Sequence, residues 1–261
     1  MYDPESKILT AGIVVALVPK LLVRIDPVTK KELRDSGGEY VVVNYETFKN
    51  GANSKKPFEH WGLKLIDRDV KSVNASKYKS RIEGALNNGG YKLILNGCQK
   101  GAACGCRVSV KFNVDVYVMS ESDARKLNAN NIIILFPSVD RADSSHWGEV
   151  KYIINVASEK EEVMDQVKAH EVGHLFNFPD EYFRRGGSVH KQYIKNNGDL
   201  DFDVGKTNAG GKIDVTWQLE SPENLMGYGA NLSSAITRPY YVEYIRRWFS
   251  EYTNKEWMVG V

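Results

Sequence analysis

The sequence predicts an α+β fold in which a twisted, mostly antiparallel or mixed sheet is combined with a few helices. Residues 107–119 alternate strictly between apolar and polar side chains, which is typical of a strand with one buried face. Residues 158–178 carry apolar side chains at helical spacing, and a second amphipathic helix is expected from about Pro239. Together these patterns predict a sheet backed by helices.

Length and composition are those of a globular domain. The chain has 261 residues, of which 42% are hydrophobic and 26% are charged, and it is long enough to enclose a substantial core. We expect residues 1–261 to form one domain, with a β-rich part over 1–150 and the main helices and a long loop over 151–261. The net charge of +2 argues against a nucleic-acid partner, and no apolar segment is long enough to span a bilayer.

The apolar run at residues 8–18 has the length of the apolar region of a signal peptide. However, Asp3 and Glu5 precede it with only Lys7 to offset them, whereas a signal peptide needs net positive charge at this point. We therefore expect a buried strand that continues to about residue 25. If the protein is secreted, the sequence predicts export without a cleaved signal peptide.

Further elements are expected along the chain. Strands are predicted at residues 41–45, 91–95, 131–136 and 151–157, and helices over residues 75–88 and after Ser120. Ser158 and Glu161 form a capping box for the helix over 158–178, which Pro179 ends. Residues 183–220 are rich in Gly, Asn and Asp and predict a long irregular loop. His146 and Trp147 either line a substrate cleft or lie at the edge of the core.

Three cysteines, Cys98, Cys104 and Cys106, lie within nine residues. Their odd number leaves at least one thiol outside an internal disulfide. A disulfide at a hairpin tip would favour an oxidising compartment, and three half-buried thiols are the alternative.

The strongest functional signal is the string His170-Glu171-Val172-Gly173-His174. On a helix, His170 and His174 project from the same face one turn apart, so that two imidazoles can bind one Zn²⁺. Glu171 is placed to take a proton from a water molecule at the metal, as amide hydrolysis requires. The alternative is a surface helix with two solvated histidines.

Two carboxylates are candidates for the third zinc ligand. Asp180 lies ten residues after His170, at the spacing of the metzincin pattern HExxHxxGxxH/D. Glu223, in the string SPENLMGYG, would be returned to the zinc by a loop in a His₂Glu site. Asn177 stands where metzincins have a glycine, which argues against Asp180.

The chain resembles the zincin metallopeptidases. Its string Asn224-Leu225-Met226-Gly227-Tyr228 is similar to the Met-turn of metzincins, and the order of strand, zinc helix, long loop, Met-turn and C-terminal helix also matches. The resemblance implies a zincin-like fold, Zn²⁺ as cofactor and a methionine packed beneath the metal at Met226. It also implies that Tyr228 donates to the oxyanion, with a tyrosine packed under the turn as the alternative.

A closer resemblance is carried by HEVGHLFNFPDEY and the later ENLM. These strings are similar to the metallopeptidase effector domains at the C-termini of type VI secretion VgrG spike proteins, over roughly residues 150–250. The resemblance places the third ligand on Glu223, which we prefer here to Asp180. It also implies a secreted toxin effector that acts in the target-cell periplasm and has a cognate immunity protein.

The sequence thus predicts a zinc-dependent metalloendopeptidase with a protein or peptide substrate and Glu171 as general base. One alternative is a hydrolase of peptidoglycan peptides on the same fold. Another is a binding module in which zinc only stabilises the fold. Glu171 argues against the binding module, because a purely structural zinc site does not need it.

Overall fold

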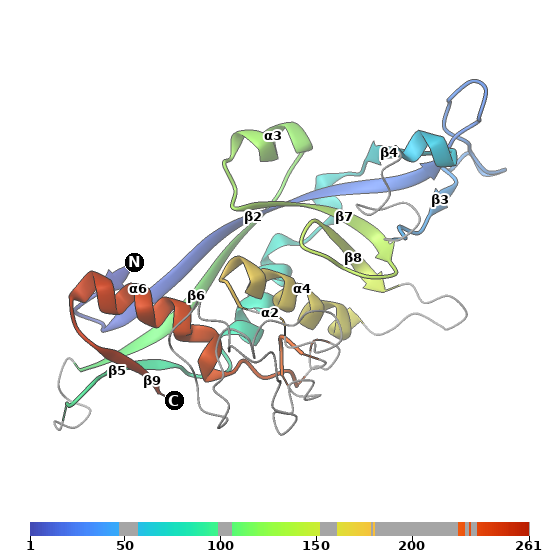
Figure 1. Ribbon diagram of the computed structural model, residues 1–261. Coiled ribbons are helices and arrows are strands. Elements are labelled where there is room, and N and C mark those ends of the chain that lie inside the picture. Colours follow the sequence, from blue (N-terminus) through green and yellow to red (C-terminus); the bar gives the residue numbers. More distant parts are fainter. Residues whose placement is uncertain are drawn as a thin grey trace, which may run out of the picture.

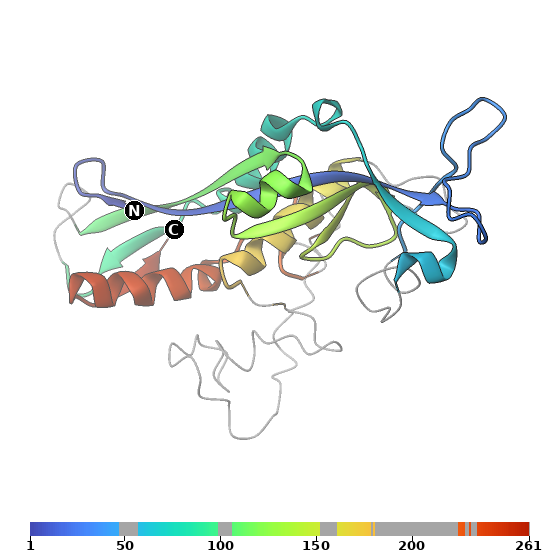
Figure 2. The same cartoon turned by 90° about the horizontal axis from the view of Figure 1, so that it is seen from above.

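The fold is organised around β2 (Ile8–Arg24), a strand of 17 residues that runs along most of the molecule (Figures 1 and 2). The structure is a computed structural model that describes residues 1–46, 57–98, 106–151, 161–178, 180, 224–227, 230 and 234–260. Most side chains of β2 are buried, as expected for its apolar sequence. The prediction of a buried strand up to about residue 25 is therefore confirmed.

β2 lies within a mixed sheet whose strands follow the order β8-β7-β2-β6-β5-β9. β2 pairs in parallel with β6 (Arg107–Val118) and β7 (Asn131–Val139), and β7 pairs in parallel with β8 (His146–Lys151). β5 (Lys92–Leu95) pairs antiparallel with β6 and with β9 (Trp257–Gly260). The expected mixed sheet is confirmed, and the four longest described strands are its parallel members.

Shorter strands lie alongside β2 near its two ends. These strands pair antiparallel with β2, and they are β1 (Tyr2–Asp3), β3 (Val42–Val43) and β4 (Leu63–Asp67). α2 lies in the connection from β2 to β6 and α3 in the connection from β6 to β7, as expected for crossovers between parallel strands, whereas the short connection from β7 to β8 contains no helix. Two 3₁₀ turns, η1 (Phe58–Trp61) and η2 (Val70–Ser72), flank β4.

The helices cover both faces of the sheet (Figure 1). α2 (Ala75–Leu86) and α4 (Glu161–Leu175) lie on one face, and α3 (Glu121–Lys126) lies on the other. The Asn74 side chain caps α2 and the Ser120 side chain caps α3, so both helices begin where the sequence predicted. None of the helices in the described part of the chain is both long enough and apolar enough to cross a membrane.

The C-terminal segment returns to the sheet beside the N-terminus. A 3₁₀ turn, η4 (Pro239–Val242), leads into α6 (Glu243–Thr253), which confirms the helix predicted from about Pro239. The ring of Phe249 packs edge-on against Tyr2, with 5.0 Å between the ring centroids. β9 then adds an edge strand beside β5, where no sequence pattern predicted one.

The predicted alternation of β6 is confirmed in its burial. One side of this strand faces the core, and its buried residues are Val108, Val110, Phe112, Val114 and Val116. The Phe112 ring contacts the rings of Phe176 and Phe178, which follow α4. The sheet core and the C-terminal end of α4 are therefore packed together.

Some sequence predictions need correction or fall outside the described residues. β8 begins at His146, earlier than the strand predicted over 151–157, and residues 152–160, including Ser158, are outside the described part. Trp147 is fully buried, which confirms the core alternative for that residue. Cys98 and Cys106 are half-buried, and Cys104 is outside the described residues, so both the disulfide and the three-thiol alternative stay predictions.

Candidate metal centre

Charged side chains connect α4 to α2 within the two helical turns that precede His170. Arg81 of α2 forms an ion pair with Asp165 of α4. Lys168, which is only 1% exposed, lies 3.5 Å from the same carboxylate and places its ammonium group over the Tyr78 ring. Burial lowers the pKa of Lys168 to about 8. These contacts fix the helix that carries the histidine motif, which a precise site requires.

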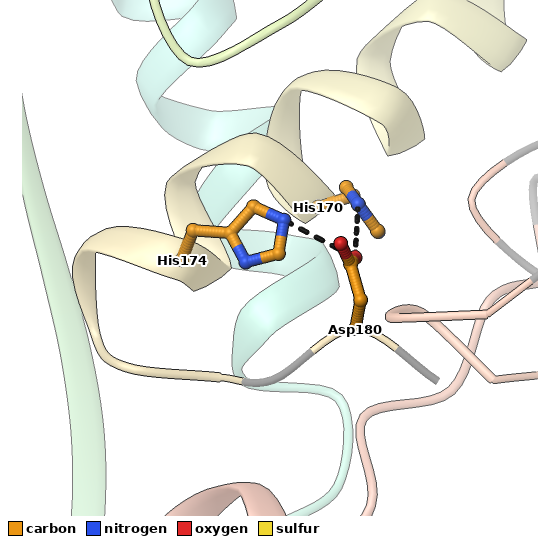
Figure 3. Close-up of side chains that lie close together, drawn as sticks. All are labelled: His170, His174 and Asp180. Carbon is orange, nitrogen blue, oxygen red and sulfur yellow. Dashed lines mark ion pairs between the residues drawn. The ribbon is translucent and has the colours of Figure 1, made fainter. Parts of the chain in front are cut away.

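α4 presents His170 and His174 on one face, as the four-residue spacing predicted. His170 is almost completely buried and His174 is half-buried. Their ring centroids are 4.9 Å apart and the ring planes are nearly perpendicular. Both rings point toward Asp180, which follows the end of the helix (Figure 3).

The chain reverses sharply after α4 through a left-handed residue. Asn177 has a φ of 62°, and its amide donates to the carbonyl of His174 at 3.0 Å. The Phe178 amide donates to the carbonyl of Gly173, also at 3.0 Å. This pair of hydrogen bonds is the Schellman motif, in which asparagine can replace glycine. The missing glycine therefore does not count against Asp180, and that expectation is corrected, because Asn177 makes the turn itself.

The turn brings three potential ligand atoms together. Oδ1 of Asp180 lies 3.2 Å from Nε2 of His170 and 3.2 Å from Nε2 of His174 (Figure 3). The three ligand atoms of the cluster all lie within 4.8 Å of one another. Ligands about 2.0–2.1 Å from a tetrahedral zinc ion would be about 3.3 Å apart, which is close to the two observed distances.

Hydrogen bonds on the far side of each ring orient both histidines. Nδ1 of His170 lies 2.9 Å from the carbonyl oxygen of Leu225, and Nδ1 of His174 lies 2.9 Å from that of Phe178. A carbonyl oxygen can only accept, so Nδ1 must donate in each pair. In the neutral ring the lone pair is then on Nε2, which faces Asp180. Histidines that bind metals have the same arrangement.

The cluster therefore fits a metal ion on chemical grounds. Two imidazole lone pairs and one carboxylate oxygen converge, and the buried Oδ1 of Asp180 has no hydrogen-bond partner among the described residues. Electron-rich atoms at this separation repel one another unless a proton or a metal cation lies between them, so the same contacts form an ion pair when a histidine is protonated. A nitrogen and oxygen donor set of this kind suits zinc.

The Met-turn-like segment, residues 224–227, packs against α4 at the candidate site. The Met226 amide donates to the Tyr241 hydroxyl at 3.2 Å, and the Met226 side chain is fully buried. A Cβ atom added to Gly173 would lie only 2.8 Å from Sδ of Met226 and 3.0 Å from Cδ2 of Phe178. Glycine in the histidine motif thus permits this close approach, and Met226 is a packing residue as predicted.

Burial and neighbouring charges shift the pKa values of Glu171, His174 and Asp180 in different directions. Burial raises the pKa of Glu171; the charges of His170 and His174 oppose this shift, and those of Asp143 and Asp180 add to it. Burial opposes ionisation of Asp180, but the two histidines hold the pKa of its carboxyl group well below the usual value. Burial likewise lowers the pKa of His174, and Asp180 outweighs this effect, so the pKa is raised.

The structure brings together only part of the predicted site. His170, His174 and Asp180 meet, whereas Glu223 and Tyr228 lie outside the described residues, and their assigned roles remain predictions. The carbonyl oxygens of Leu225 and Phe178 were not predicted. Main-chain acceptors have no side-chain signature, so only the metzincin-like spacing could have pointed to these segments.

The fold and the cluster define an α+β protein with a candidate His₂Asp metal site. The chain matches no protein-family model, no curated protein and no solved structure. The functional interpretation therefore depends on the residues and geometry of the site itself.

Proposed function

We propose that this protein is a zinc-dependent metallopeptidase in which His170, His174 and Asp180 bind the metal. The observation that carries the proposal is the convergence of Oδ1 of Asp180 on both Nε2 atoms, with each Nδ1 already committed to a carbonyl. Asp180 replaces Glu223 in this assignment because, within the described part of the chain, Asp180 is the carboxylate that lies against both imidazoles, and Glu223 is outside that part.

Bound zinc would supply a Lewis acid that polarises the substrate carbonyl and acidifies a water molecule. Glu171 lies on the same helix, is largely shielded from solvent, and has a raised pKa because of that burial. Its carboxylate can accept the proton of the attacking water and deliver it to the leaving amine. Glu171 therefore favours a catalytic zinc site over one that only stabilises the fold.

The proposed substrate class is a protein or peptide, since this donor set with an adjacent glutamate suits amide hydrolysis. Action as a secreted toxin effector, and pairing with an immunity protein, stay predictions that depend on the sequence resemblance alone.

The test compares wild type with Glu171→Gln, which keeps the shape of the side chain but removes the base. We expect both proteins to bind about one zinc per chain, measured by elemental analysis. We expect hydrolysis of unfolded casein or of a quenched-fluorescent peptide library to fall by about 10²–10⁴-fold in the variant. Glu251→Gln, on the exposed surface of α6, is the control for the same chemical change.

Undiminished hydrolysis by Glu171→Gln would remove Glu171 from the mechanism. If wild type binds zinc but cleaves neither peptides nor purified peptidoglycan fragments, the non-catalytic alternative is favoured. Cleavage of peptidoglycan fragments alone would instead assign the site to the peptidoglycan peptide.

A further inference from the structure

The carbonyl that orients His170 belongs to a backbone segment with a specific support. The Leu225 amide donates to the carbonyl of Ile236 at 2.8 Å, and Asn224 pairs with Ile236 in a parallel bridge. The Leu225 carbonyl then accepts the Nδ1 hydrogen of His170. The position of Ile236 therefore influences where the acceptor for His170 lies.

Residues at and just after the C-terminal end of α2 form hydrogen bonds with the segment Ala235–Thr237. Nδ2 of Asn88 donates to the carbonyl of Ala235 at 2.6 Å, and Oδ1 of Asn88 accepts from the Thr237 amide at 3.2 Å. The Asn88 amide thus pairs with backbone groups on both sides of Ile236, as a neighbouring β-strand would. The Thr237 hydroxyl also donates to the carbonyl of Ala85 at 2.9 Å, and the Tyr91 hydroxyl donates to the carbonyl of Thr237.

We infer that Asn88 is a positioning residue for the metal ligand His170. It acts through the Ala235–Thr237 segment and the carbonyl of Leu225, so the inference rests on the proposed metal site. The partners of metal-bound histidines fix ring orientation and tautomer, and their loss weakens metal binding. Asn88 itself is exposed, so its replacement removes two hydrogen bonds without opening a cavity in the core.

The neighbouring residue provides a matched control. The side chain of Asn87 makes the same two-point contact with Phe112 of β6, accepting from its amide at 2.8 Å and donating to its carbonyl at 3.0 Å. Phe112 is also held in register by β2, where it is the partner of Ala11. The Asn87 contact is made to the Phe112 backbone, which stays paired with β2 when the contact is lost, so the Phe112 ring should keep its place against Phe178. Loss of the Asn87 contact should therefore weaken the α2–sheet junction without moving the metal ligands.

The experiment titrates Co²⁺, and then Zn²⁺ in competition, into metal-free wild type, Asn88→Ala and Asn87→Ala. We expect both variants to have lower urea midpoints as apoproteins. We expect only Asn88→Ala to bind the metals about tenfold more weakly and to change the visible absorption spectrum of bound Co²⁺. Asn88→Asp keeps the acceptor for Thr237 but not the donor to Ala235, and it should show a smaller loss.

Equal affinity and identical Co²⁺ spectra in Asn88→Ala and Asn87→Ala would overturn the positioning role while leaving the metal site intact. Failure of wild type to bind either metal would be a different result, and it would overturn the proposed function together with this inference. If Asn88→Ala does not fold, the same comparison is made with Asn88→Asp. Unchanged metal binding by that variant would reject the inference.

Discussion

Nδ1 of His170 lies 2.9 Å from the carbonyl oxygen of Leu225, a residue 55 positions later in the chain. The contact connects α4 to the Met-turn-like segment, residues 224–227. Because a carbonyl can only accept, the contact also determines which nitrogen of the ring is left to face a metal. Leu225 therefore contributes to the site through its main-chain carbonyl, which orients His170, although its side chain cannot bind a metal.

The identity of the third ligand can be tested by replacing each candidate carboxylate. We expect Asp180→Ala to weaken zinc binding by about 100-fold or more, because loss of a partner outside the ligand set already costs 10–100-fold. Glu223→Ala should bind zinc like wild type in the same competition titration. The opposite pattern would restore the assignment to Glu223 that the sequence favoured.

Metal removal should lower thermal stability through the same three ligands. A ligand that binds only the folded state at about 1,000 times its Kd stabilises that state by about 4 kcal/mol. For a chain of this size, chelation should then lower Tm by about 10 °C, measured by differential scanning calorimetry. His174→Ala should show little change on chelation. An equal decrease in that variant would indicate that zinc stabilises the protein from another site.

Asn177 should be replaceable by glycine but not by alanine. Its φ of 62° lies in the left-handed region, where a residue with an ordinary side chain pays about 1–2 kcal/mol. We expect Asn177→Ala to lower the free energy of urea unfolding by about 1 kcal/mol and to weaken zinc binding, because the turn positions Asp180. Asn177→Gly should keep both properties within about 0.5 kcal/mol. Equal effects of the two substitutions would contradict this role of the turn.

The acidic group Asp143 should contribute to stability in a pH-dependent manner. Burial opposes its ionisation, but hydrogen bonds from His146 and Ser145 lower the pKa of Asp143 below its usual value of 3.8. A lowered folded-state pKa stabilises the protein above pH 3.8 and loses this contribution as the pH falls toward the folded-state value. Asp143→Asn should therefore lower the unfolding free energy at pH 7 by about 1–2 kcal/mol, and by less at about pH 3, which lies below the unfolded-state pKa. A difference from wild type that stays constant across this range would reject the linkage.

Local sequence patterns predicted the elements of the fold better than their arrangement. The alternation in β6 and the apolar run of β2 predict directly which side chains are buried. The parallel pairing of these strands depends on contacts across about 100 residues, which local periodicity does not encode. β9 has four residues and no clear alternation, and its identity as a strand comes from pairing with β5.

The candidate site also combines features that local sequence patterns predict with features that depend on tertiary structure. The helical spacing of His170 and His174 could be predicted from the sequence, because the geometry of a helix determines which side chains share a face. The preference for Glu223 rests on the family resemblance, and the doubt about Asp180 rests on the turn after the helix, where Asn177 replaces the metzincin glycine. Asn177 made that turn hard to predict, since asparagine adopts the left-handed conformation less often than glycine but still readily. The support from Asn88 arises from tertiary structure alone.

The central claim is that one metal ion is bound by His170, His174 and Asp180. The most direct measurement is X-ray diffraction from crystals grown with zinc, with data collected on both sides of the zinc absorption edge. We predict one strong anomalous peak about 2.0–2.2 Å from Nε2 of each histidine and from Oδ1 of Asp180. A zinc peak bound by other residues, or fully zinc-loaded protein with no peak between these three atoms, would contradict the claim.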